Sequence, residues 1–152
     1  MSPARRDKTG AWMVGIAAWA SIIVPIAVDW NSSHLFNDNW PSHAKLHDAM
    51  SFLMSIGLGV GALWLLHTRA RRGKSDIWAA GWLSIWSWAS LLLAKLAPGA
   101  TYENPAEGLD VPHIAHVPIL PNAVLAGLLV AIGLWGAWLM VAAKDGMKPT
   151  SP

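Results

Sequence analysis

Residues 34–54 read HLFNDNWPSHAKLHDAMSFLM and lead from a polar loop directly into an apolar segment. Pro41 suits the first turn of a helix, where its missing N–H is not needed. Within that helix His43 and His47 lie four residues apart and therefore share one face. The same face continues with Met50, Met54 and Gly61. The stretch predicts imidazole and thioether side chains along one side of a helix, close to its polar end.

The chain as a whole is apolar, and its charges are segregated. Of its 152 residues, 54% are hydrophobic and 13% are charged, whereas a soluble domain carries about 25% charged residues. Uncharged runs occupy residues 9–28, 49–68, 77–94 and 111–143. A bilayer-spanning helix needs about 20 apolar residues, and a soluble core helix would carry charge on its outer face. We therefore predict an all-α fold, an integral membrane bundle of four transmembrane helices.

We expect one membrane domain over residues 1–152, with helices at about 11–28, 41–68, 76–97 and 121–143. Residues 1–10 are interpreted as a mobile basic tail. Pro25 is expected to kink the first helix, and Ser75 or Asp76 to cap the third. The remaining long segment, residues 98–120, is interpreted as an outer loop, and loops of this length are often functional.

The basic residues give an orientation. Nine of the eleven fall on one side of the predicted bundle: Arg5, Arg6, Lys8, Arg69, Arg71, Arg72, Lys74, Lys144 and Lys148. The positive-inside rule then predicts that both termini are cytoplasmic, in what we expect to be a bacterial inner membrane. Five of the six histidines fall on the opposite side, and only His67 lies on the basic side.

Several functional classes are excluded or find no support. The chain has no cysteine, so disulfides, thiolate metal sites and cysteine nucleophiles are excluded. Its basic residues lie at membrane edges, so the small positive net charge does not indicate nucleic-acid binding. No serine-nucleophile or phosphate-binding motif is present.

Two kinds of cofactor site are compatible with the histidines, because imidazole is both the commonest metal ligand and an axial ligand of haem iron. In the first, one histidine of the second helix binds haem. In the second, a zinc or copper ion is bound where the long loop returns to the same membrane face, by His43, His47, His113 and His116. Asp48 follows His47 directly and is not expected on the same face. Histidines solvated at the membrane interface are the third interpretation.

The chain resembles the styrene oxide isomerases, which are small four-helix membrane proteins. The matching residues are His34 and Trp40 in the first loop, Ala44-Lys45-Leu46-His47 entering the second helix, Gly81-Trp82 in the third, and Ala97-Pro98 after it. The resemblance extends loosely over the length and is specific around His47. It implies a homotrimer with haem b between subunits, and ferric iron that acts as a Lewis acid on an epoxide to give an aldehyde.

Carried over onto this sequence, the resemblance makes His47 the haem ligand. The other residues expected around the cofactor are His43, Met50, Met54, Lys45 and Trp40. The candidate catalytic residues are Trp88, which stands where the family has a tyrosine, and Tyr102 in the long loop. The family's asparagine of the second helix falls on Leu53. Because leucine has no polar group and an indole N–H can only donate, a different reaction on a small apolar molecule, or electron transfer, stays open.

A non-catalytic function is also compatible with the sequence. Eleven tryptophans and several glycines suit close packing of membrane helices, so the chain is also interpreted as an accessory subunit of a larger membrane complex. The tryptophans of the third helix, Trp78, Trp82 and Trp86, form a stripe along one face, and Trp88 points elsewhere. A four-helix protomer has little room for a planar cofactor inside its bundle, which together with the resemblance predicts a homo-oligomer.

Overall fold

The structure, a computed structural model, describes residues 1–68, 72–102, 113–114, 117–118 and 120–146. Four long helices form the fold: α1 (Pro3–Asp29), α2 (Ser42–Thr68), α3 (Lys74–Ala94) and α4 (Pro121–Gly146). Each is long and apolar enough to cross a membrane. The all-α fold is therefore confirmed, and the four helices fit an integral membrane protein. Between α3 and α4, the two-residue strands β1 (His113–Ile114) and β2 (Val117–Pro118) pair antiparallel.

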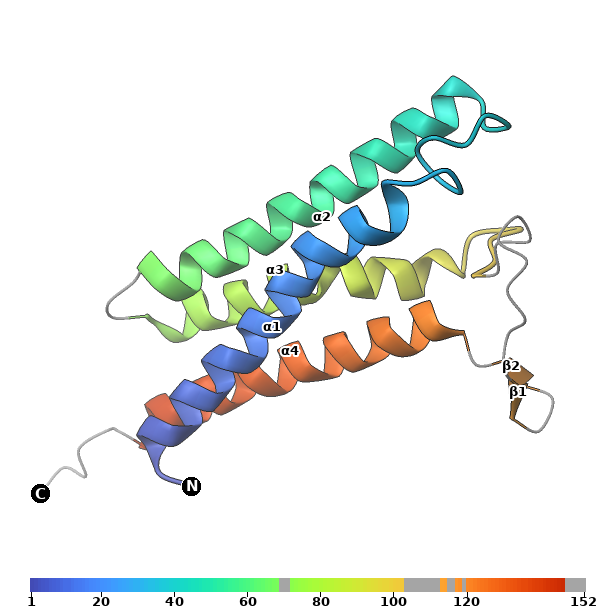
Figure 1. The fold of residues 1–152 in the computed structure, drawn as a ribbon. Helices are drawn as coiled ribbons and strands as arrows, with labels where there is room; N and C mark the ends of the chain where they lie inside the picture. The colour runs from blue at the N-terminus through green and yellow to red at the C-terminus, as the bar shows by residue number, and fades with distance from the viewer. Residues whose placement is uncertain (69–71, 103–112, 115–116, 119, 147–152) are drawn as a thin grey trace, which may run out of the picture.

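The helices run up and down, so the start of α1, the end of α2, the start of α3 and the end of α4 share one end of the bundle (Figure 1). Contacts at this end bear out the arrangement. The guanidinium of Arg72 forms a salt bridge with the Asp7 carboxylate, with nitrogen and oxygen 3.4 Å apart, and Lys74 forms a salt bridge with Asp145. Among the described helices, α1 and α3 each contact all the others, whereas α2 and α4 lie apart. The loop between α1 and α2 lies at the opposite end of the bundle.

Two helix starts differ from the expected ones. The first helix begins at Pro3 rather than near residue 11, because Ser2 is its N-cap and the Ser2 hydroxyl accepts a hydrogen bond from the Arg5 N–H. The basic segment expected to be a mobile tail is therefore helical. The third helix is capped by Gly73, whose N–H donates to the Asp76 carboxylate at 3.0 Å, so Asp76 lies inside the first turn. Pro25 lies within α1, which continues to Asp29.

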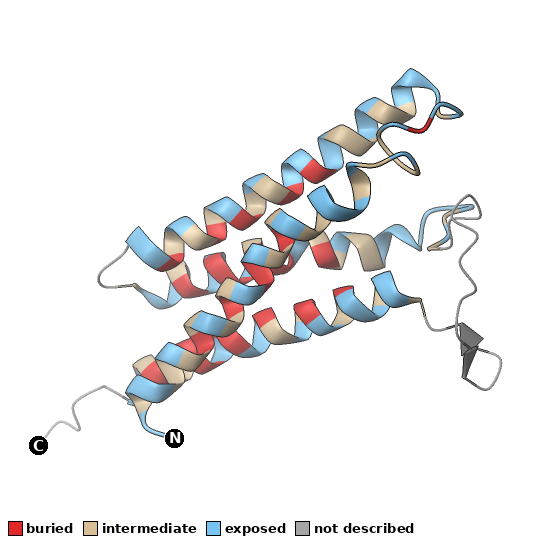
Figure 2. Cartoon of the chain, viewed as in Figure 1, coloured by how far each residue is buried: buried red, intermediate tan, exposed pale blue. Residues whose placement is uncertain are grey.

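Small residues bring the helices together, and the buried residues lie along the surfaces where the helices meet (Figure 2). A Cβ atom added at Gly136 would lie 2.8 Å from the Gly10 carbonyl oxygen of α1. One added at Gly59 of α2 would lie 2.6 Å from the Ala18 oxygen. Since real Cβ atoms do not approach backbone oxygen this closely, glycine is required at these crossings.

A group of serines joins three of the helices inside the bundle. The Ser21 hydroxyl of α1 donates to the Ser84 carbonyl of α3 at 3.2 Å, and the Ser87 hydroxyl donates to Ser21 at 3.0 Å. From α2, the Ser55 hydroxyl donates to the Ser21 carbonyl at 2.8 Å. Hydrogen bonds of this kind hold helices together where apolar lipid offers no hydrophobic driving force.

Candidate functional site

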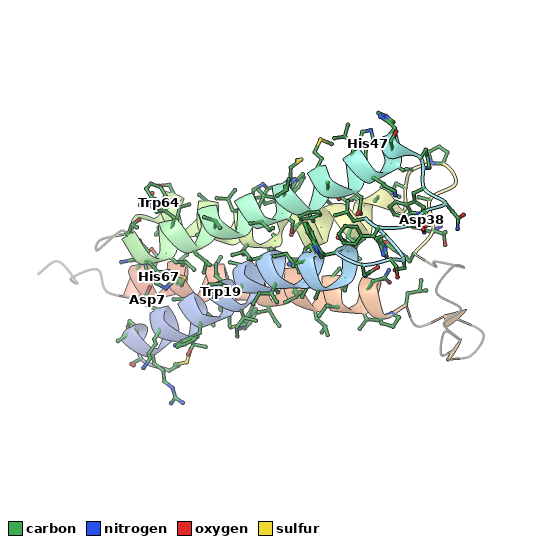
Figure 3. The ribbon with its side chains drawn as sticks, turned by 45° about the horizontal axis from the view of Figure 1, so that its top comes forward. Asp7, Trp19, Asp38, His47, Trp64 and His67 are labelled. Atoms are coloured by element: carbon green, nitrogen blue, oxygen red, sulfur yellow. The ribbon has the colours of Figure 1, made fainter. Side chains whose placement is uncertain are left out.

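His43 and His47 of α2 lie together at the end of the bundle away from the termini. The Nε2 atoms of His43 and His47 are 3.1 Å apart, and their rings meet edge to face with centroids 4.5 Å apart. One ring must donate and the other accept, so the pair holds one N–H between two nitrogens. Both side chains are exposed. His47 lies on the edge of α2 that is turned away from the other helices, at the opposite end of the bundle from His67 (Figure 3).

The loop that precedes α2 is held in place by its own polar side chains. The Asn31 amide oxygen accepts from both the N–H and the hydroxyl of Ser33, and Asn37 donates to the Ser33 carbonyl. Asparagine side chains commonly stabilise turns by such hydrogen bonds to nearby backbone. A ring contact joins the loop to α2, since Trp30 packs edge to face against Phe52 with ring centroids 5.8 Å apart. These contacts hold the loop next to the first half of α2.

An open hollow of about 520 Å³ adjoins His47. Its lining comes from the end of the loop and the first turns of α2: Trp40, Ala44, His47, Asp48, Met50 and Ser51. The hollow is shallow and wide open, so the residues that line it would contact a ligand from one side. An imidazole, a carboxylate and a thioether thus border one space beside a tryptophan. This arrangement suits an apolar ligand with one polar or metal-binding group.

Asp48 belongs to this hollow, although the sequence argument placed it on another face. One oxygen of its carboxylate is buried and has no hydrogen-bond partner among the residues that the structure describes. Asp48 also lies close enough to Asp29 and His34 for their charges to interact. A shallow hollow covers more than one strip of a helix, so residues one position apart can both line it. The spacing of the histidines does not predict how wide the hollow is, so it could not show that Asp48 lines it.

Met50, Met54 and Gly61 follow one another along the same side of α2, as expected, but Gly61 lies closer to α3. Met50 and Met54 are both exposed. A Cβ at Gly61 would lie 3.5 Å from Leu83 of α3, whereas one at Gly57 would meet nothing within 4 Å. Gly57, rather than Gly61, is therefore the glycine of the open face. Lys45 is half-buried on α2.

The two candidate catalytic residues lie elsewhere. Trp88 is buried with Ala126 and Leu129, and its indole N–H donates to the Ala17 carbonyl at 3.4 Å. The Tyr102 hydroxyl donates to the Leu92 carbonyl at the end of α3. Both side chains are thus engaged in holding helices and loop ends, and neither lines the hollow beside His47.

The described residues do not place the side chains of His113 and His116, the other two histidines expected at a metal site. His113 belongs to β1, where only its backbone pairing with Pro118 is described. His116 lies outside the described residues. Within residues 1–68, 72–102 and 120–146, no group of three or more histidine or acidic side chains is placed to hold a metal ion. In this part of the chain, His43 and His47 contact each other and no third side chain of this kind joins them.

Comparison with known proteins assigns a family but no activity. Residues 13–137 match the model of a family of unknown function (DUF6640), and the chain belongs to that family. The match runs from within α1 to within α4, so it covers the loop and hollow described above. No curated protein matches the chain, and no solved structure does.

Proposed function

We propose that this member of the DUF6640 family is a membrane protein that binds a metal-based cofactor through His43 and His47. The observation that carries the proposal is the 3.1 Å separation of the two Nε2 atoms on an exposed helix face. Tetrahedral zinc holds imidazole nitrogens at 2.0–2.1 Å, which sets neighbouring nitrogens about 3.3 Å apart. The pair therefore stands close to the geometry of two ligands on one ion.

We favour a chelated zinc or copper ion, because the two nitrogens are already near the separation of two ligands on one ion. Binding an ion would replace the hydrogen bond between the two rings. His113 and His116 remain the further ligands expected from the sequence. Copper in its reduced state also accepts thioether ligands, and Met50 borders the same hollow as His47. In this form His43 and His47 hold the ion, while Trp40 and Met50 form the apolar sides of a space for a small apolar molecule.

A haem-dependent isomerase is the second candidate, and a specific observation supports it. In the residues of α2 that follow His47, Met50, Leu53 and Met54 are exposed on the outside of the bundle. Together they form the kind of apolar surface that a haem face needs. His47 would be the axial ligand, and His43 would have to release its hydrogen bond. The bound haem would supply a Lewis acid for the isomerisation of a small apolar epoxide to a carbonyl product. Because this surface points away from the other helices, haem there would lie between copies of a homo-oligomer, as in a trimer.

Three single variants distinguish these forms. The full-length protein is purified in detergent, and its Soret absorbance and its iron, copper and zinc contents are measured. A chelated ion is expected to be lost from both His43→Ala and His47→Ala. Haem is expected to be lost from His47→Ala and largely kept in His43→Ala. The matched control is His67→Ala, at the other end of the same helix, which should keep either cofactor.

The proposal fails if the wild-type protein carries neither haem nor a transition metal, in which case a non-catalytic membrane subunit takes its place. Isomerase activity is measured separately, as aldehyde formation from an aryl epoxide. No product above that of the metal-free protein would leave a cofactor protein with a different reaction.

We further propose that both termini face the cytoplasm of a bacterium and that the protein lies in the inner membrane. The positive-inside rule supports this orientation, since Arg72 and Lys74 lie at the end of the bundle that also holds the start of α1. Each helix also carries an exposed tryptophan toward that end: Trp12, Trp64, Trp78 and Trp138. Tryptophan is enriched at both interfaces of a membrane with water, so these residues fit a membrane boundary there, while the basic residues alone support the orientation. The cofactor site would then face the periplasmic side.

A further inference from the structure

His43 and His47 supply half of the usual ligand set for a metal ion bound only by protein. Structural zinc is almost always bound by four ligands. In residues 1–68, 72–102 and 120–146, no third histidine or acidic side chain is placed to join the pair. Both rings are exposed, and His47 lies on the side of α2 that is turned away from the other helices (Figure 3). The open coordination positions therefore point out of the bundle.

The rest of this face is suited to close contact with another helix. Met50 and Met54 are exposed along it, and a side-chain carbon added at Gly57 would meet nothing within 4 Å. Glycine on an outer face lets a second backbone approach closely. The opposite face of α2, with Ser55 and Gly59, is already used inside the bundle. An approaching helix can thus reach the histidines without disturbing the protomer.

Membrane insertion restricts how two copies can meet. All copies of a chain enter the bilayer in the same orientation, so a two-fold axis that relates two of them runs along the membrane normal. In a two-fold contact the same surface patch serves both partners. A residue on the contacting face then meets its own counterpart at the same depth. Two α2 helices that meet through this face bring one histidine pair against the other.

We infer that a second copy of this chain completes the site, so that His43 and His47 from each of two copies bind one zinc or copper ion between their α2 helices. This inference rests on the chelated-ion form of the proposed function. The second copy supplies the two ligands that one copy lacks, and the metal ion links the two subunits. Water, or His113 and His116 of the same chain, are the alternative ways to complete the ligand set.

The first test measures stoichiometry and mass together. The full-length protein is stripped of metal with a chelator in detergent and is then titrated with Co²⁺, whose visible absorption reports tetrahedral coordination. The expected result is one cobalt ion per two chains, with a doubling of the protein mass measured by light scattering. His47→Ala should lose both the absorption and the metal-dependent dimer. His67→Ala should keep both.

The second test locates the contact. The chain has no native cysteine, so a single introduced cysteine reports only its own surroundings. Met54→Cys lies on the proposed contact face and should cross-link to its counterpart, more strongly with metal than without. Leu128→Cys is the matched control, because Leu128 is also exposed but lies on α4. It should show no metal-dependent cross-linking.

The outcomes separate the inference from the proposed function. One cobalt ion per chain with unchanged mass, or metal loss from His113→Ala or His116→Ala, overturns the two-copy site and leaves the metal site standing. Haem bound through His47 alone also overturns it. A protein that binds neither a metal ion nor haem contradicts the proposed function itself.

Discussion

Trp88 is a residue for which a structural and a catalytic function can be separated by experiment. It is buried, and its indole N–H donates to the Ala17 carbonyl. We predict that Trp88→Ala lowers the free energy of unfolding by about 3–5 kcal/mol, as for other large aromatic truncations. Trp88→Phe should cost much less and should not affect the cofactor binding that we propose for His43 and His47. Thermal unfolding followed by circular dichroism measures both.

Trp12→Ala is the control for this prediction, because Trp12 is exposed on α1. It should change the unfolding temperature far less than Trp88→Ala does. If Trp88→Phe instead abolishes turnover in a protein of unchanged stability, the catalytic assignment that the sequence suggested for Trp88 is supported.

At the same scale, the sequence predicts the histidine face but not the hollow. The four-residue spacing of His43 and His47 fixes their common face in any α-helix, and Met50 and Met54 follow the same rule. Asp48 enters the site because the hollow is broad. Whether Gly57 or Gly61 stays open depends on where Leu83 of α3 packs. Such contacts come from the packing of other helices, which periodicity does not describe.

At the scale of elements, the glycines of α4 allow a matched comparison. A Cβ at Gly133 would overlap Ile85 of α3 and lie 3.2 Å from the Ser84 hydroxyl, whereas one at Gly127 would meet nothing within 4 Å. Overpacking of this kind costs about 1–3 kcal/mol. We predict that Gly133→Ala destabilises the protein by about that amount. Gly127→Ala should be neutral or stabilising, because alanine is the better helix former.

Unfolding of both variants in a mild-to-harsh detergent series measures the difference. Equal stability of the two variants would contradict the close α3–α4 crossing. A loss of stability in Gly127→Ala alone would place the outer face of α4 in a contact with another chain.

The extents of the helices follow from charge and length, and their ends follow from local caps. Four uncharged runs are enough to predict four spanning helices, because a bilayer excludes charge over about 20 residues. The basic residues Arg5, Arg6 and Lys8 obscured the start of α1, since they look like a solvated tail. The Ser2–Pro3 pair is the signal that would have found it. The start of α3 at Gly73 depends on a backbone bond to Asp76 that spacing alone did not single out.

For the whole molecule, the proposed orientation predicts a pattern of chemical labelling. Single cysteines are introduced in place of Ala4 and Asp38, which lie at opposite ends of the bundle. In intact cells a membrane-impermeant maleimide should label Asp38→Cys and leave Ala4→Cys unlabelled until the cells are opened. The reverse pattern would contradict cytoplasmic termini and would place the histidines on the cytoplasmic side.

The helices of the bundle are held together in two different ways. Ser21, Ser55 and Ser84 connect α1, α2 and α3, so directional bonds restrict the rotations of these three helices relative to one another. Through Gly133 and Gly136, α4 fits against α3 and α1 by shape. The first three helices of the chain are thus joined by hydrogen bonds between serines, whereas the last helix depends on close packing at glycines, where a single added methyl group is enough to disturb it.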